Sequence, residues 1–170
     1  MKTIYKLIAS VIALTGLSIG ANAQSTATAS TTAILVTPIS VSKTTDMHFG
    51  TVAASATAGT VVLDYSDGRT TTGGVSLPSG STLQKTAVFA VSGEGTSGFS
   101  ISIPTSPITL TGSVSGTMTV SNFQADLGAS GTLVGGSKNI KVKATLNVGS
   151  GQAAGTYTNA SDLFVTVNYN

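Results

Sequence analysis

Residues 161–170 read Ser-Asp-Leu-Phe-Val-Thr-Val-Asn-Tyr-Asn and end the chain. If this stretch is extended, one face carries Leu163, Val165, Val167 and Tyr169. The opposite face carries Asp162, Phe164, Thr166, Asn168 and Asn170. Because successive side chains of a strand point to opposite faces, this alternation indicates a half-buried strand. Val, Phe, Thr and Tyr also favour strands. We therefore predict a C-terminal β-strand with an apolar inner row.

The same alternation occurs upstream in residues 139–148. Its inner row would consist of Ile140, Val142, Ala144, Leu146 and Val148. A turn rich in Gly and Ala, residues 149–155, separates the two stretches. The end of the chain therefore predicts a hairpin-like pair of strands that covers an apolar core.

Shorter strand-forming stretches fill the rest of the chain. They are residues 33–41, 47–52, 59–65, 70–77, 83–91, 99–103, 107–111 and 117–123. Gly and Pro separate them, and no stretch after Ala23 has sustained helical periodicity. Many short strands at close spacing are typical of a β-sandwich or a β-barrel. The side chains expected to face inward are Phe89, Phe99, Ile101, Leu146, Val165 and Val167.

Residues 1–23 have the pattern of a secretory signal peptide. Lys2 and Lys6 precede an apolar run over residues 7–19, and Ala21-Asn22-Ala23 forms a cleavage site. We expect an exported protein without an integral membrane segment after cleavage. We expect residues 24–32, which are small and polar, to be flexible. Residues 33–170 would form a single domain.

Charge and cysteine content exclude several classes of protein. Two of the eight Lys and Arg residues lie in the signal, and six acidic residues balance the others. Nucleic acid is therefore not an expected partner, since binding it requires surplus positive charge. Lys138, Lys141 and Lys143 cluster, and we interpret them as a solvated sheet face. With no cysteine, the fold must be stable without disulfides.

The sequence offers little for catalysis. Its single histidine, His48, has no G-x-S-x-G nucleophile elbow to serve. Residues 93–98 match G-x-G-x-x-G in letters, but a strand follows where a dinucleotide site needs a helix, so we expect a hairpin turn. For residues 64–68 an Asp-Gly turn is favoured over a calcium loop. We predict no enzyme activity, no metal and no cofactor.

A series of short motifs, taken in order, resembles the DUF4402 family of exported bacterial proteins. The motifs are Phe49-Gly50-Thr51-Val52, Gly59-Thr60-Val61-Val62-Leu63, Gly73-Gly74-Val75, Ala87-Val88-Phe89-Ala90-Val91-Ser92-Gly93, Phe99-Ser100-Ile101-Ser102-Ile103-Pro104, Leu146-Asn147-Val148, Gln152-Ala153-Ala154-Gly155-Thr156-Tyr157 and Val165-Thr166-Val167-Asn168-Tyr169. The resemblance covers nearly all of the chain after the signal. The family name carries no assigned activity.

The end of the chain is also similar to the pilins of chaperone–usher pathways. That resemblance implies an immunoglobulin-like antiparallel β-sandwich that is incomplete and is completed by a strand from another chain. It further implies a periplasmic chaperone and an outer-membrane usher as partners. Like subunits would then form a homopolymer at the cell surface, where an adhesive role is open.

An apolar row at a sheet edge also invites pairing with another chain. The candidate donor strand consists of Ala33, Leu35, Ile39 and Val41, and the candidate acceptor edge of Val165, Val167 and Tyr169. In the alternative, residues 33–41 are simply the first strand of a self-complete immunoglobulin-like domain, which would be secreted or bind at a surface.

Overall fold

The computed structural model describes residues 24–80 and 82–170. Contacts divide the chain into Met1–Ile34 and Leu35–Asn170, and the second unit holds every strand of the described residues. These strands are β1 (Ser40–Thr45), β2 (Ala53–Leu63), β3 (Arg69–Ser76), β4 (Ala87–Ser92), β5 (Gly98–Ser102), β6 (Ile108–Gly112), β7 (Thr117–Ala125), β8 (Ser130–Thr132), β9 (Ser137–Val148), β10 (Tyr157–Thr158) and β11 (Thr166–Tyr169). The described part of the chain has no helix, as expected.

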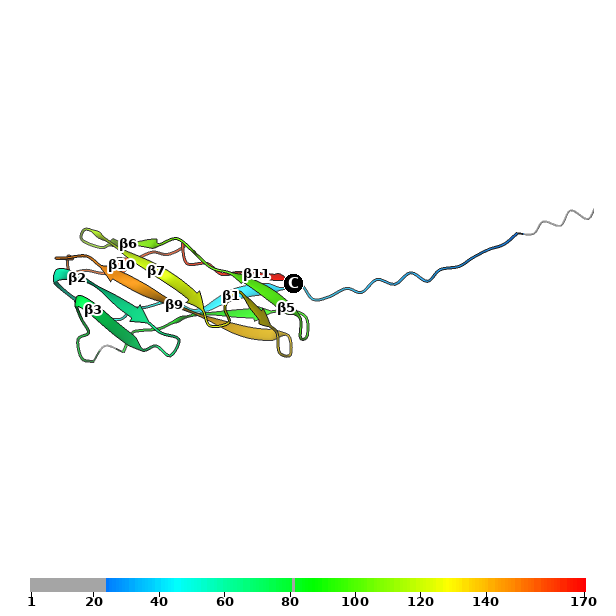
Figure 1. The fold of residues 1–170 in the computed structure, drawn as a ribbon, viewed down its shortest axis with the longest axis horizontal. Helices are drawn as coiled ribbons and strands as arrows, with labels where there is room; N and C mark the ends of the chain where they lie inside the picture. Colours follow the sequence, from blue (N-terminus) through cyan, green and yellow to red (C-terminus); the bar gives the residue numbers. More distant parts are fainter. Residues whose placement is uncertain (1–23, 81) are drawn as a thin grey trace, which may run out of the picture. The chain divides into compact units, whose positions relative to one another are not determined.

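The larger sheet is built around β9 (Figure 1). One edge of β9 pairs with β7, which leads on to β6 and β10. The other edge is shared, because β4 pairs with its first half and β2 with its second half. Beyond these lie β1, paired with β4, and β3, paired with β2. All pairs are antiparallel. Because β4 and β2 share one edge of β9, the sheet divides into two branches at the middle of β9.

The smaller sheet has β5 at its centre, with β11 and β8 on its two edges. Its inner side chains Phe99 and Val167 pack against Phe89 of β4 and Ile140 of β9. The two sheets therefore face each other across an apolar core, which confirms the antiparallel β-sandwich.

One prediction about the end of the chain is wrong. Residues 139–148 and 161–170 were expected to form a hairpin-like pair, but β9 and β11 lie in different sheets. The apolar alternation fixes which side chains face inward and leaves open which strand is the partner.

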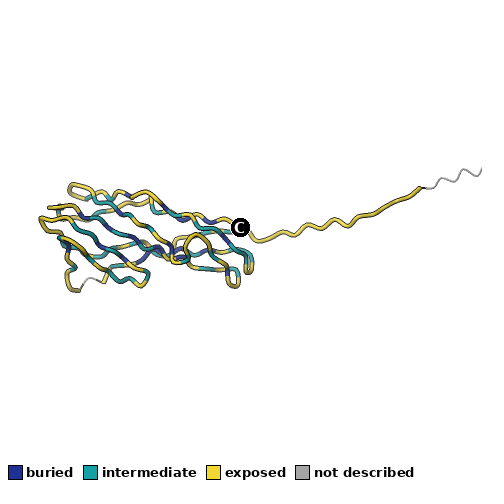
Figure 2. Tube along the Cα trace, in the orientation of Figure 1, coloured by how far each residue is buried: buried dark blue, intermediate teal, exposed yellow. Residues whose placement is uncertain are grey.

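The alternation itself is confirmed. Every residue of the expected inner row of β9 is buried, from Ile140 to Val148. Of the inward-facing side chains predicted from sequence, five are buried and Ile101 is partly buried against the same core. Figure 2 shows the buried residues along the middle of the strands and the exposed ones at the turns. Phe99, with no exposed surface, lies in the centre.

A second apolar cluster lies under the branch formed by β2, β3 and β7. It consists of Val61, Val75, Val120, Ala144, Leu146 and Val148. No strand of the smaller sheet covers it. Instead, Met47, Phe49 and Val52 pack on it from an irregular segment whose strand pairing is limited to one isolated bridge, His48 with Lys85. The second layer of the sandwich is therefore formed by the smaller sheet at one end and by an irregular segment at the other.

The bounds of several strands differ from expectation. The first strand begins at Ser40 rather than Ala33, because Pro38 cannot donate a backbone hydrogen bond to a ladder. The short strands β8 and β10 were not expected: neither lies in a stretch predicted to form a strand, and β10 begins two residues after the predicted turn 149–155. Their side chains carry no apolar alternation that would mark them.

Two turns follow the sequence signals in part. Residues 64–68 form the β2–β3 turn, in which Asp64 Oδ1 accepts the N–H groups of Ser66 and Gly68 at 2.7 and 2.8 Å. Residues 93–98 also form a turn, with Ser97 N–H donating to the Glu94 carbonyl at 3.0 Å. This second turn joins β4 to β5 in the other sheet, so the expected hairpin is wrong.

The signal-peptide prediction concerns residues 1–23 and lies outside the described residues. Among the described residues there is no helix long and apolar enough to cross a membrane.

Candidate functional site

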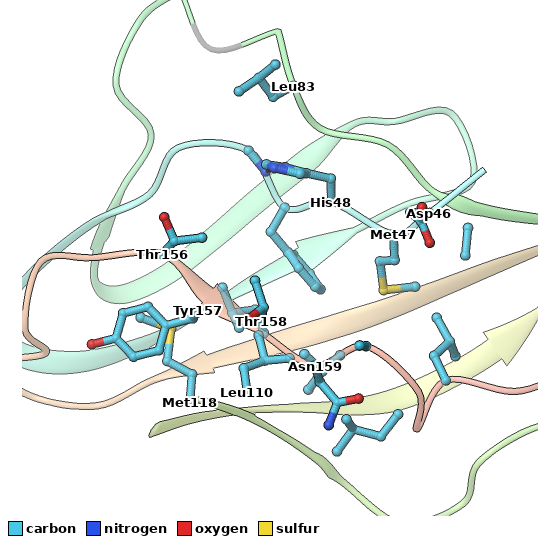
Figure 3. A pocket seen from close by; sticks show the side chains of 18 of the residues that line it. Asp46, Met47, His48, Leu83, Leu110, Met118, Thr156, Tyr157, Thr158 and Asn159 are labelled. Carbon is cyan, nitrogen blue, oxygen red and sulfur yellow. Dashed lines mark hydrogen bonds between the residues drawn. The ribbon is translucent and has the colours of Figure 1, made fainter. Parts of the chain in front are cut away.

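An apolar groove of about 540 Å³ opens where the second layer has no strand (Figure 3). Its floor is the inner face of the larger sheet. The floor residues include Ala87, Phe89, Ile108, Leu110, Met118, Val120, Phe123 and Leu146. They come from β4, β6, β7 and β9, so the groove lies across the middle of the core rather than on a peripheral surface.

One wall of the groove is the irregular segment 46–52. The backbone of His48 pairs with that of Lys85 through two hydrogen bonds of 2.8 Å. Arg69 Nη1 donates to the carbonyls of Phe49 and Thr51 at 2.7 and 2.9 Å. A few specific bonds therefore hold this wall in place instead of a continuous ladder.

The opposite wall is residues 155–163, which Figure 3 shows across from His48 and Met47. Its β10 strand pairs with β6 over two residues. The Tyr157 hydroxyl accepts from Gln152 Nε2 at 2.8 Å and lies 2.7 Å from the Ala153 carbonyl. Asn159 Oδ1 accepts the N–H groups of Ser161 and Asp162.

Beyond this wall the backbone has unused hydrogen-bonding groups. Within the described residues, no hydrogen bond joins the backbone of Leu163, Phe164 or Val165 to another residue. In β11, Val167 lies opposite Ile101, whose N–H donates away from β11 to Ala129. The N–H and C=O groups of Val167 therefore face the second edge of β11, where no described strand pairs.

The residues predicted as a donor strand divide into two groups. Ile39 and Val41 are partly buried against the domain's own core, next to the pairing of β1 with β4. Ala33 and Leu35 are exposed, Leu35 to 95%. The predicted acceptor residues Val165 and Val167 are buried, and Tyr169 is partly buried. Ile39 and Val41 thus pack on the core of their own domain, whereas Ala33 and Leu35 are exposed.

A family model for a domain of unknown function, DUF4402, matches residues 39–169. The chain belongs to the DUF4402 family. No curated protein and no solved structure matches the chain.

The DUF4402 match includes both walls and the floor of the groove. It begins at Ile39, the first residue that packs on the core. The exposed apolar residues Ile34, Leu35 and Val36 precede the matched region. The groove is thus part of the DUF4402 domain, and the exposed apolar segment is an extension of it.

The rim of the groove carries few charges in this DUF4402 domain. Lys43 and Asp46 form an exposed ion pair there. His48 is exposed, and its Nδ1 accepts the N–H of Gly50 at 2.8 Å. Among the described residues, no carboxylate or hydroxyl is hydrogen-bonded to His48 to make a catalytic set. Among the described residues there is no cluster of metal-ligating side chains.

A separate charged cluster lies at the base of the β2–β3 turn. Asp67 accepts the Thr86 N–H at 2.7 Å and the Lys85 ammonium at 3.0 Å, and these bonds lower the pKa of Asp67. Burial, followed by the charge of Asp126, raises the pKa of Tyr65. Lys141 Nζ donates to the Tyr65 carbonyl, and Lys143 Nζ lies 5.1 Å from the centre of the Tyr65 ring. These lysines therefore support the turn as well as covering the sheet.

The sequence did not reveal the groove. Its walls consist of residues 46–52 and 155–163. The first overlaps the short strand expected over residues 47–52, and the second runs from the end of the expected turn 149–155 into the start of the expected strand 161–170. No sequence signal marks the groove, because an alternating strand shows which of its faces is buried and leaves open what covers that face. The number of strands does not reveal the groove either, because the sequence does not say to which sheet each strand belongs.

Proposed function

We propose that this protein is a structural subunit of a bacterial surface fibre, assembled by donation of a strand from one copy to the next. The observation that carries this proposal is the open apolar groove, which is flanked by backbone groups without partners. A sandwich whose core is open along one line, next to an unpaired edge, is suited to receive an extended chain.

The donated segment is the exposed apolar run before β1. Ile34, Leu35 and Val36 are consecutive and are 83%, 95% and 55% exposed. In an extended donor the Leu35 side chain lies on one face and those of Ile34 and Val36 on the other. Each side chain that the joint buries would stabilise it by about 1.5–3 kcal/mol. Residues 24–32, small and polar, would serve as a linker because they bury too little to offset the entropy of ordering.

The receiving site is the groove together with the free edge of residues 163–167. An extended segment there would add backbone hydrogen bonds to Leu163, Val165 and Val167. Its inward side chains would cover the floor beside Met118 and Phe123. The tail between Ala23 and Lys43 carries no charged side chain, so its entry would bury no unpaired charge.

Export and partners follow from the same proposal. An apolar groove of this size would promote association of free subunits during transit. We propose a periplasmic chaperone that covers it and an outer-membrane usher that orders the exchange for a second copy. The final location would be the cell surface or the extracellular space, with adhesion as an open accompanying role.

We also propose that the protein is not an enzyme. His48 accepts a backbone hydrogen bond at the groove rim, where its role is structural. Changing His48 to Ala should leave assembly intact. A hydrolytic activity that disappears with this substitution would contradict the proposal.

Assembly can be tested with residues 24–170 by size-exclusion chromatography and electron microscopy, with the chaperone and usher supplied. Leu35→Asp should prevent fibre growth because the joint would bury an unpaired carboxylate. Ser30→Asp adds the same charge to the same exposed segment and should allow growth. Equal assembly by both variants would contradict the role of Leu35.

A self-complete surface-binding domain is the second candidate. The pairing of β1 with β4, and the packing of Ile39 and Val41 on their own core, favour it. Deletion of residues 24–36 separates the two. Both candidates predict that the shortened chain still folds. Only the fibre proposal predicts that the intact chain polymerises and that the deletion abolishes this polymerisation. An intact chain that stays monomeric with chaperone and usher present would favour the self-complete domain.

A further inference from the structure

Both backbone groups of Thr37 are held by side chains from distant parts of the domain. The Thr37 N–H donates to Glu94 Oε2 at 2.9 Å. The Tyr169 hydroxyl donates to the Thr37 carbonyl at 2.6 Å and accepts the Glu94 N–H at 2.6 Å. These three bonds close a ring through three residues, which we call the Thr37 clasp.

The clasp joins β11 to two neighbouring strands, β1 and β4, which pair with each other but not with β11. Thr37 precedes β1, Glu94 lies in the turn after β4, and Tyr169 is the last residue of β11. β1 belongs to the larger sheet and β11 to the smaller one, and no ladder connects them. The clasp therefore ties the start of the first strand to both layers of the sandwich.

The surroundings of Tyr169 are shaped for this contact. A Cβ atom on Gly93 would collide with the Tyr169 hydroxyl and would come within 3.1 Å of Leu133. The ring of Tyr169 packs on the core cluster that contains Phe89 and Phe99, and this packing fixes the position of its hydroxyl. The β1–β4 ladder begins at Ser40, and Pro38, which has no N–H to donate, separates it from Thr37.

We propose that the Thr37 clasp is a mechanical anchor, which prevents β1 from being peeled off β4 when residues 24–36 are pulled. β1 is an edge strand whose first pair is Ser40 with Ser92. A pull on the preceding chain would open such a ladder one pair at a time, starting at Ser40. With the clasp closed, the load passes at Thr37 to β11 and to the turn after β4. This inference goes beyond the proposed assembly, because it holds for a pull of any origin.

Amide hydrogen exchange of residues 24–170 tests the anchor without any partner. Tyr169→Phe removes one hydroxyl and leaves the ring packed. The lost hydroxyl makes two bonds, of which the one to the Thr37 carbonyl holds the chain before β1. We expect the amides of β1 to exchange about two- to tenfold faster, the effect on local opening of losing that bond to Thr37. The amides of β9 should keep the parental rate. Glu94→Ala, in an exposed turn, should accelerate β1 in the same way if Tyr169→Phe fails to fold.

Tyr157→Phe is the matched control, since it removes a hydrogen-bonded tyrosine hydroxyl at the groove. It should leave the relative exchange of β1 and β9 unchanged. Single-molecule pulling between residue 24 and a cysteine introduced at Ser66 should then show a lower opening force for Tyr169→Phe than for Tyr157→Phe. Unchanged β1 exchange in both clasp variants, or the same opening force for the two tyrosine variants, would overturn the anchor.

Discussion

Single side chains stabilise this domain where strand pairing is missing. Arg69 holds the groove wall 46–52, Asn159 holds the turn before β11, and Tyr169 holds the chain before β1. Each uses hydrogen bonds to backbone groups that no ladder satisfies. Such bonds contribute about 0.5–1.5 kcal/mol each, and more when the donor is charged. Individual residues should therefore have measurable local effects.

Asp67 should make stability depend on pH. The Thr86 N–H and the Lys85 ammonium hold the pKa of Asp67 below its ordinary value, which is about 3.9 in an unfolded chain. The stabilisation is therefore complete above this value and is lost as the pH falls through the folded pKa. Asp67→Asn should melt below the parent at pH 7, and this difference should shrink toward pH 3.

Asp67→Asn keeps the backbone comparable, because Asn also tolerates the positive φ of 64° at this position. Asp46→Asn, which changes an exposed carboxylate, is the control and should show a small difference at every pH. A melting difference for Asp67→Asn that is constant from pH 7 to pH 3 would contradict the assignment.

Phe99 tests the core at a single position. It has no exposed surface, so Phe99→Ala should reduce the free energy of unfolding by about 3–5 kcal/mol. Phe164 lies on the outer face near β11 and is 49% exposed, so Phe164→Ala should cost much less. Denaturant unfolding compares the two. Equal losses would mean that the strand register assigned here is wrong.

At the scale of elements, the irregular segment 46–52 substitutes for a strand. Arg69→Gln should free the carbonyls of Phe49 and Thr51 from a charged donor and reduce stability by about 1–3 kcal/mol. Hydrogen exchange should rise at His48, whose amide donates to the Lys85 carbonyl, and at Gly50, whose amide donates to His48 Nδ1. Lys138→Gln removes a charge elsewhere on the sheet and should leave these amides unchanged. Protection of His48 that persists in Arg69→Gln would show that the wall does not depend on Arg69.

Elements with an unbroken apolar alternation could be predicted from sequence. The expected inner row of β9 is buried, and that of the C-terminal strand is buried at Val165 and Val167 and partly buried at Leu163 and Tyr169, because the period of two in a strand is independent of its partner. β8 and β10 could not be found, since two or three small or polar residues show no period. The start of β1 was misplaced because residues 33–36 are apolar and yet exposed, so their apolar character does not come from folding of their own domain.

At the scale of the whole molecule, the sandwich was predictable and its sheet order was not. Side-chain patterns say which face of a strand is buried, whereas the partner of β11 depends on contacts between residues far apart in the chain. The sequence pattern names candidate donor and acceptor residues. It does not say which of the donor residues pack on their own domain and which are exposed. The open groove is a property of the assembled sheets, so it becomes visible only in the structure.

The most direct measurement of strand donation between copies is a disulfide formed across the proposed joint. The chain has no cysteine, so Leu35→Cys with Leu163→Cys gives one defined pair. Mild oxidation should produce a ladder of covalent oligomers on a denaturing gel, because the sulfur atoms meet only when residue 35 of one copy enters the groove of another. Leu35→Cys with Val134→Cys, an exposed position outside the groove, is the control and should give no ladder. A gel that shows only monomers after oxidation, or ladders of equal strength in both variants, would contradict strand donation between copies.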